Sequence, residues 1–205
     1  MLKIDMIQES IARARLSGLA RLRKRFSRSD DGVAAVEFAF IAPLMLTLLI
    51  GIVDISNAVS ISWRLSQLNR TLADLSSQSR TMTTAERNNI FGASAATLSP
   101  YTGPAPVMVI SSVVLNNTGV ARVCWSASNV SGNELAANSV VTMPNTDMAV
   151  PNTSYIVASS RVVYTGVISP NFTMNAQKLY FRPRAGVVGG PGNAEQVVTT
   201  TQGPC

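Results

Sequence analysis

Residues 31–53 read DGVAAVEFAFIAPLMLTLLIGIV, an apolar run interrupted by one acid, Glu37. At about 1.5 Å per residue, the 21 residues from 33 to 53 would span about 30 Å as a helix, the thickness of a bilayer's hydrocarbon core. A buried core helix is the alternative, but the residues before the run are densely basic and those after it change to a polar pattern. We therefore expect a transmembrane helix at residues 33–53.

Positive charge is concentrated before this run. Of the 17 Lys and Arg residues, eight precede Gly32 with four acids, whereas nine follow it with seven acids. Positive residues beside one end of a membrane helix keep that end in the cytoplasm. We expect residues 1–32 to be a basic cytoplasmic leader, either a weakly amphipathic helix on the membrane surface or a disordered tail. Only Phe26 accompanies these basic residues, which argues against a nucleic-acid partner.

Apolar residues recur at helical spacing beyond the run. Five of them fall three or four residues apart, on one face of a helix that would reach about residue 79: Ile61, Leu65, Leu68, Leu72 and Leu75. This face would pack on the chain's own domain or pair with another helix as a coiled coil. Thr83 and Glu86 have the spacing of a capping box, so a second helix is expected at 84–97.

The chain after residue 106 is rich in Val, Ile, Tyr and Thr, with turn residues between the runs. The pattern predicts four strands and an irregular segment: strands at 107–115, 120–126, 154–165 and 178–182, and irregular structure at 129–153. The expected fold class is α+β, a long N-terminal helix, half transmembrane and half amphipathic, with a small antiparallel sheet. The extracytoplasmic domain would cover residues 54–185, and a Gly/Pro-rich tail with little to bury would cover 186–205.

Catalytic chemistry has little support in the sequence. The chain has no histidine, which excludes Ser-His-Asp and Cys-His arrangements and most zinc sites. The segment GVVGGPGN lacks the Lys of a phosphate-binding loop. The acids after residue 54 are scattered, so an active site would need carboxylates distant in sequence: Asp74, Glu86, Glu134, Asp147 and Glu195. We expect no enzymatic activity, no cofactor and no metal.

The two cysteines are Cys124 and Cys205. Disulfides persist outside the cytoplasm, so an even pair there favours a Cys124–Cys205 bridge. Closing so long a loop would contribute roughly 4 to 5 kcal/mol in the chain-entropy model. Two free thiols are the alternative.

Glu37 needs an explanation, because a carboxylate inside a membrane helix costs about 2.5 to 3.5 kcal/mol on insertion scales. One explanation is that the spanning helix begins near Phe38, which leaves Glu37 at the membrane interface close to Arg28. The other is that a positive group on a neighbouring helix pairs with Glu37.

Gly32, the following VAAVEFAF with Glu37 in its fifth place, and Pro43 resemble the N-terminus of a type IV prepilin. The arrangement with Phe38 after the glutamate is most similar to the TadE-like family of the tight-adherence (Tad) pilus machinery. The resemblance implies that a prepilin peptidase cuts between Gly32 and Val33. It also implies that Glu37 neutralises the new amino terminus of an adjacent subunit.

The same resemblance implies a minor pilin, pseudopilin or pilus assembly protein in the bacterial inner membrane. Its partners would be the membrane, the prepilin peptidase, other pilins and the pilus assembly platform. One alternative is an uncleaved single-pass membrane protein with an extracytoplasmic binding domain. Another is a secretory signal cut after Ala58. The three predict different mature N-termini: Val33, Met1 and Val59.

Overall fold

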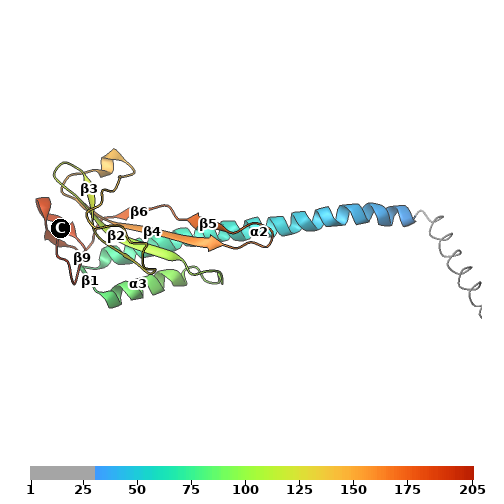
Figure 1. Cartoon of the computed structure of the whole chain (residues 1–205), viewed down its shortest axis with the longest axis horizontal. Helices are drawn as coiled ribbons and strands as arrows, with labels where there is room; N and C mark the ends of the chain where they lie inside the picture. Colours follow the sequence, from blue (N-terminus) through green and yellow to red (C-terminus); the bar gives the residue numbers. More distant parts are fainter. Residues whose placement is uncertain (1–30) are drawn as a thin grey trace, which may run out of the picture. The chain divides into compact units, whose positions relative to one another are not determined.

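The computed structural model describes residues 31–205, so residues 1–30 of the expected 1–32 leader lie outside the described part. The chain divides into two compact units, Met1–Ile52 and Val53–Cys205. Helix α2, Asp31–Gln78, contributes to both (Figure 1).

The first unit, in its described part, consists of the first 22 residues of α2. By length and composition α2 can cross a membrane. Its large apolar side chains from Val33 to Ile52 are exposed, with Phe38 at 70% and Phe40 at 78%. Nothing in the described part of the chain covers this apolar surface, so it requires lipid or another chain.

In the second unit, α2 continues as an amphipathic helix and buries the face that the spacing predicts. Leu65, Leu68 and Leu72 are at most 1% exposed and belong to the main hydrophobic core. Ile61 is also buried, and Leu75 packs against the same core. The apolar face therefore packs on the chain's own domain, one of the two arrangements expected.

A five-stranded antiparallel sheet forms the other layer. Its main strands run in the order β3-β2-β4-β5, and β6 pairs with β4 beside β5. The bounds are β2 Val107–Leu115, β3 Ala121–Ser128, β4 Ser154–Tyr164, β5 Phe172–Asn175 and β6 Leu179–Phe181. The α+β fold class is confirmed, and four of these strands lie where the sequence predicts them. Strand β5 was not predicted.

Helix α3, Thr84–Ala96, follows α2 and completes the helical layer (Figure 1). Thr83 caps it, since the Glu86 backbone N–H donates to the Thr83 hydroxyl at 3.1 Å. The Glu86 carboxylate accepts from the Ser79 hydroxyl. The capping position is as predicted, while the acid of the expected capping box binds the segment before the helix.

The sheet has an apolar surface on both faces. One face joins the main core with α2 and α3, where Trp125 and Ile156 are at most 5% exposed. The other face forms a smaller cluster around Val113 and Tyr155. Val141 and Met148, from the irregular segment between β3 and β4, pack against it. This segment contains one short 3-10 helix, η1, Thr146–Met148.

The expectation of a C-terminal tail with little to bury is wrong. Four short elements lie there: β7 Val187–Gly189, η2 Pro191–Asn193, β8 Ala194–Gln196 and β9 Val198–Thr199. Strand β9 pairs in parallel with β1, Thr81–Met82. Val197 is fully buried, and its carbonyl accepts from the Trp125 indole N–H at 2.7 Å. The Gly/Pro pattern concealed a buried run, Ala194 and residues 196–198, of which Ala194 and Val197 belong to the main core.

Strand β4 runs alongside α2 in the opposite direction (Figure 1). The Asn69 amide donates to the Ala158 carbonyl at 3.3 Å, and the Tyr164 hydroxyl donates to the Asp54 carboxylate at 3.0 Å. From Asn69 back to Asp54 a helix rises about 22 Å, and from Ala158 to Tyr164 a strand advances about 20 Å. The end of β4 therefore reaches the start of this unit's helix.

Candidate functional site

The residues predicted to carry processing and assembly all lie in the first unit, on α2. Val33 and Glu37 are four positions apart, so their side chains lie on the same face one turn apart. Glu37 and Phe38 are exposed, and Gly32 is half-buried. Within residues 31–205, no cation lies within ion-pair distance of the Glu37 carboxylate. The site thus presents a carboxylate on an otherwise apolar, uncovered helix surface.

Pro43 lies inside α2 without ending it. A proline has no backbone N–H, so the Ala39 carbonyl lacks its usual partner four residues on. The Thr47 hydroxyl donates to the Pro43 carbonyl at 2.8 Å, one turn later. This bond is made to the Pro43 carbonyl, so it does not replace the one that the Ala39 carbonyl lacks.

A second cluster, in the Val53–Cys205 unit, surrounds Asp54. Asp54 is 6% exposed although it directly follows the apolar run. Its carboxylate accepts from the backbone N–H groups of Val167 at 2.9 Å and of Ile168 and Ser169 at 3.1 Å each. The hydroxyls of Ser169 and Tyr164 also donate to it, at 3.1 and 3.0 Å. Asp54 therefore anchors the loop between β4 and β5 to the helix.

These donors stabilise the charged form of Asp54. The backbone N–H of Val167 contributes most, then those of Ser169 and Ile168, and together they hold the pKa of the Asp54 carboxyl below its ordinary range. Burial acts in the opposite direction but is outweighed. Burial and the hydrogen bond to Asp54 raise the pKa of the Tyr164 hydroxyl. The pair is thus a carboxylate with a neutral phenol as donor at physiological pH.

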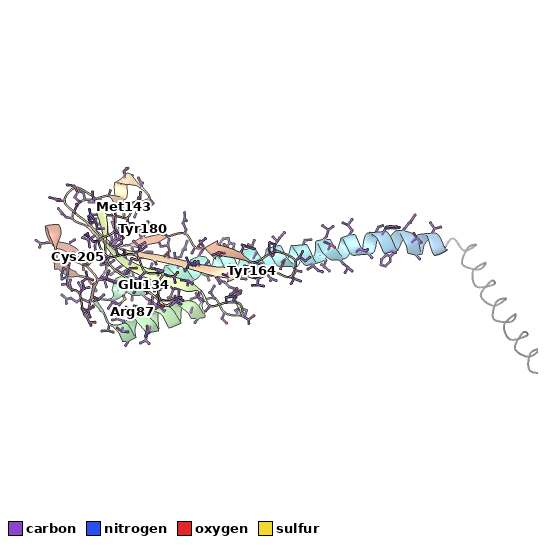
Figure 2. The ribbon with its side chains drawn as sticks, viewed as in Figure 1. Arg87, Glu134, Met143, Tyr164, Tyr180 and Cys205 are labelled. Carbon is purple, nitrogen blue, oxygen red and sulfur yellow. A yellow bond between two sulfur atoms is a disulfide. The ribbon has the colours of Figure 1, made fainter. Side chains whose placement is uncertain are left out.

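Gly166 allows the loop to fold this tightly around Asp54. A Cβ at position 166 would lie 2.6 Å from the Asp54 Oδ2 and would also meet the Ser169 hydroxyl. Phe172 begins β5 opposite Tyr164, and the two ring centroids are 5.3 Å apart. Figure 2 shows Tyr164 beside α2, at the other end of this unit from Cys205.

Cys124 and Cys205 form a disulfide, with Cα atoms 5.8 Å apart and a sequence separation of 81 residues. Two glutamines hold the cysteines in place. The Gln202 amide donates to the Cys124 carbonyl at 3.1 Å, and the fully buried Gln196 accepts from the Cys205 N–H at 3.0 Å. The bridge ties the C-terminal segment to β3.

Residues 32–67 match the model of a family described as TadE-like protein. The resemblance that Gly32, Glu37 and Pro43 suggest is therefore confirmed over this segment. These residues form a TadE-like segment. No curated protein matches the chain. No solved structure matches it.

The TadE-like segment contains the predicted site residues Gly32, Val33, Glu37, Phe38 and Pro43 together with Asp54. The structure places the first five along one stretch of α2 in the first unit, and the disulfide belongs to the second unit. No group of three or more Cys, Asp or Glu residues in the described range is arranged to hold a metal.

Asp54 is the residue of the TadE-like segment that sequence reasoning missed. Its partners lie 110 to 115 residues later in the chain, which no local pattern records. One feature of the sequence could have indicated its role: Asp54 is an acid immediately after an apolar run of membrane length. An acid there is costly unless donors surround it.

Proposed function

We propose that this protein is a pilin-like component of a Tad-type pilus machinery, either a minor pilin or an assembly protein. Residues 33–53 would hold it in the bacterial inner membrane, with the basic N-terminal leader in the cytoplasm and residues 54–205 outside. The observation that carries the proposal is the uncovered apolar surface of α2 with Glu37 on it, within a TadE-like segment.

Processing is the first step of the proposed mechanism. A prepilin peptidase would hydrolyse the peptide bond between Gly32 and Val33 and leave a free ammonium on Val33. An opposite charge offsets the cost of placing the Glu37 carboxylate in lipid. The ammonium of an adjacent subunit would supply that charge, and the exposed apolar residues around Glu37 would pack against the neighbouring helix.

The mature N-terminus tests this proposal directly. The chain is isolated from cells that hold the peptidase, and its first residue is determined by mass spectrometry. We expect Val33. Met1 would reject the processing step and favour the uncleaved membrane-anchored protein, whereas Val59 would indicate a secretory signal.

Substitution at the cut provides a matched control. Gly32→Val places a branched side chain at the scissile bond and should leave the full chain uncut. Gly51→Val changes another glycine of the same helix, where an added Cβ meets nothing within 4 Å, and should be processed normally. Equal processing of both variants would contradict a cut after Gly32.

The role of Glu37 is tested separately from processing. Glu37→Ala should still insert in the membrane and be cut, but should fail to co-purify with the other pilins. Glu37→Asp, which keeps the charge, should retain at least part of that association. If Glu37→Ala associates as well as the unchanged protein, the charge is not used in assembly.

A further inference from the structure

The loop between β4 and β5, residues 165–171, has the character of a surface that meets lipid. Val167 is 77% exposed and Ile168 is 55% exposed, and Phe172 at the base of the hairpin is 41% exposed. Residues 165–175 contain no Asp, Glu, Lys or Arg. An uncharged tip with two exposed branched apolar residues is costly in water but is favourable at a bilayer interface.

The depth of this loop follows from its anchor. Asp54 accepts three backbone N–H groups of the loop, and it is the residue directly after the apolar run that ends at Val53. The interfacial region on each side of a bilayer is about 5 to 7 Å thick. A residue that follows the span directly lies within this region, and the anchored loop lies beside it.

The hydrogen bonds also make such a location physically acceptable. Unpaired backbone N–H groups are costly where water is scarce. The Asp54 carboxylate satisfies those of Val167, Ile168 and Ser169, and five donors in all stabilise its charge. Tyr164 and Phe172 add aromatic rings, and aromatic residues are enriched at membrane interfaces.

We infer that the 165–171 loop is a second membrane contact, in which Val167 and Ile168 insert into the interface of the leaflet from which α2 emerges. The occupant of this surface is lipid rather than another copy of the chain. Together with the helix, the loop would hold the extracytoplasmic domain at two points. The inference rests on the membrane insertion of residues 33–53 that the proposed function includes.

Depth-dependent quenching tests the contact in the full chain, reconstituted in phosphatidylcholine and phosphatidylglycerol vesicles. The background is Trp63→Phe, which removes an exposed tryptophan and leaves the buried Trp125. Ile168→Trp is the test variant. Val188→Trp, at a residue of β7 that is 64% exposed, is the matched control. The quencher is phospholipid with bromine near the carbonyl end of the acyl chains.

We expect bromolipid to quench Ile168→Trp at least about twofold more strongly than Val188→Trp. Equal quenching of the two would overturn the inference. Addition of Asp54→Ala should release the loop and reduce quenching of Ile168→Trp to the level of the control. The comparison of Ile168→Trp with Val188→Trp is decisive by itself. The inference can therefore be rejected even if the variant that also carries Asp54→Ala fails to fold.

Two further readouts separate the other outcomes. The first is the quenching by aqueous acrylamide of the indole introduced by Ile168→Trp. If this indole is shielded from acrylamide only at low lipid-to-protein ratios, and bromolipid does not quench it, a second copy of the chain covers the loop. That outcome rejects the inference. Vesicle flotation after a carbonate wash reports the insertion of residues 33–53 independently. If the chains float with the vesicles but the introduced indole stays unquenched, the loop contact alone is rejected. If the chains do not float, the membrane anchor is rejected as well.

Discussion

The Tyr164 hydroxyl donates to the Asp54 carboxylate at 3.0 Å across 110 residues of sequence. It also donates to the Asp54 backbone carbonyl at the same distance. This pair joins the end of β4 to the first turn of α2 in the second unit. Removing the hydroxyl should therefore loosen the hairpin without disturbing the core.

Tyr164→Phe should lower the free energy of unfolding by about 1 kcal/mol, because it removes one buried hydroxyl and keeps the ring. The measurement is thermal or urea unfolding of the full chain in detergent micelles, followed through Trp125 fluorescence in the Trp63→Phe background. Tyr180→Phe, at a half-buried ring of β6, is a control that should change stability by less. An equal loss in both variants would contradict a special role for the Tyr164 hydroxyl.

The Asp54 carboxyl should make stability depend on pH in acid. Its folded pKa lies below the ordinary value, so its stabilising contribution is complete above about pH 5 and is lost as pH falls through the unfolded and then the folded pKa. Asp54→Asn removes this titration. The stability gap between the unchanged chain and Asp54→Asn should be constant from neutral pH to about pH 5 and should narrow below it. A gap that widens in acid would contradict the assignment.

Gly166→Ala should destabilise the domain, since the added Cβ would lie 2.6 Å from the Asp54 Oδ2. Gly92→Ala is the matched control, because position 92 is inside α3 and an added Cβ there meets nothing within 4 Å. The control should gain about 0.5 to 1 kcal/mol from helix propensity. Thermal midpoints that shift in opposite directions are the expected result, and a gain in both would show that the loop can relax.

Leu68→Ala should cost about 2 to 5 kcal/mol, because Leu68 is fully buried between α2 and the sheet. Trp63, on the same helix, is 70% exposed. Trp63→Ala should change the stability of the isolated chain by less than about 0.5 kcal/mol. Urea unfolding in micelles measures both, and a reversed order would mean that the other face of α2 packs on the sheet.

The Cys124–Cys205 bridge should appear as one linked peptide in non-reducing mass mapping. The chain-entropy model gives roughly 4 to 5 kcal/mol for a loop of this length. The double variant Cys124→Ser and Cys205→Ser should therefore unfold at a markedly lower temperature, and reduction should have the same effect on the unchanged chain. Recovery of two alkylated thiols from the unreduced protein would exclude the bridge.

Sequence patterns within a few residues were sufficient to predict several helices and strands. The leucine spacing from Ile61 to Leu75 predicts the buried face of α2, and the strand at 107–115 agrees with β2 to the residue. The β2–β3 connection is also local, since the Asn116 side chain accepts from the Thr118 and Val120 N–H groups. Each of these features depends on neighbours within a few positions.

The features that the sequence concealed depend on distant partners. Asp54 resembled a polar residue of the helix because its donors lie more than a hundred residues later. The C-terminal segment resembled a tail because its glycines and prolines mask Val197, which packs in the core and binds Trp125. The roles of Gly32 and Glu37 came from the family resemblance and stay predictions until the N-terminus is determined.

Asn69 is a single amide within the leucine face of α2, and it donates to the carbonyls of Ala158 and Gln177, the latter at 2.7 Å. Leucines alone would tolerate a slip of the helix by one turn, about 5.4 Å. Such a slip would leave the Asn69 amide among apolar side chains without a hydrogen-bond acceptor, and it would move Asp54 away from its donors. These two polar contacts therefore favour one alignment of helix and sheet over packings displaced by a turn.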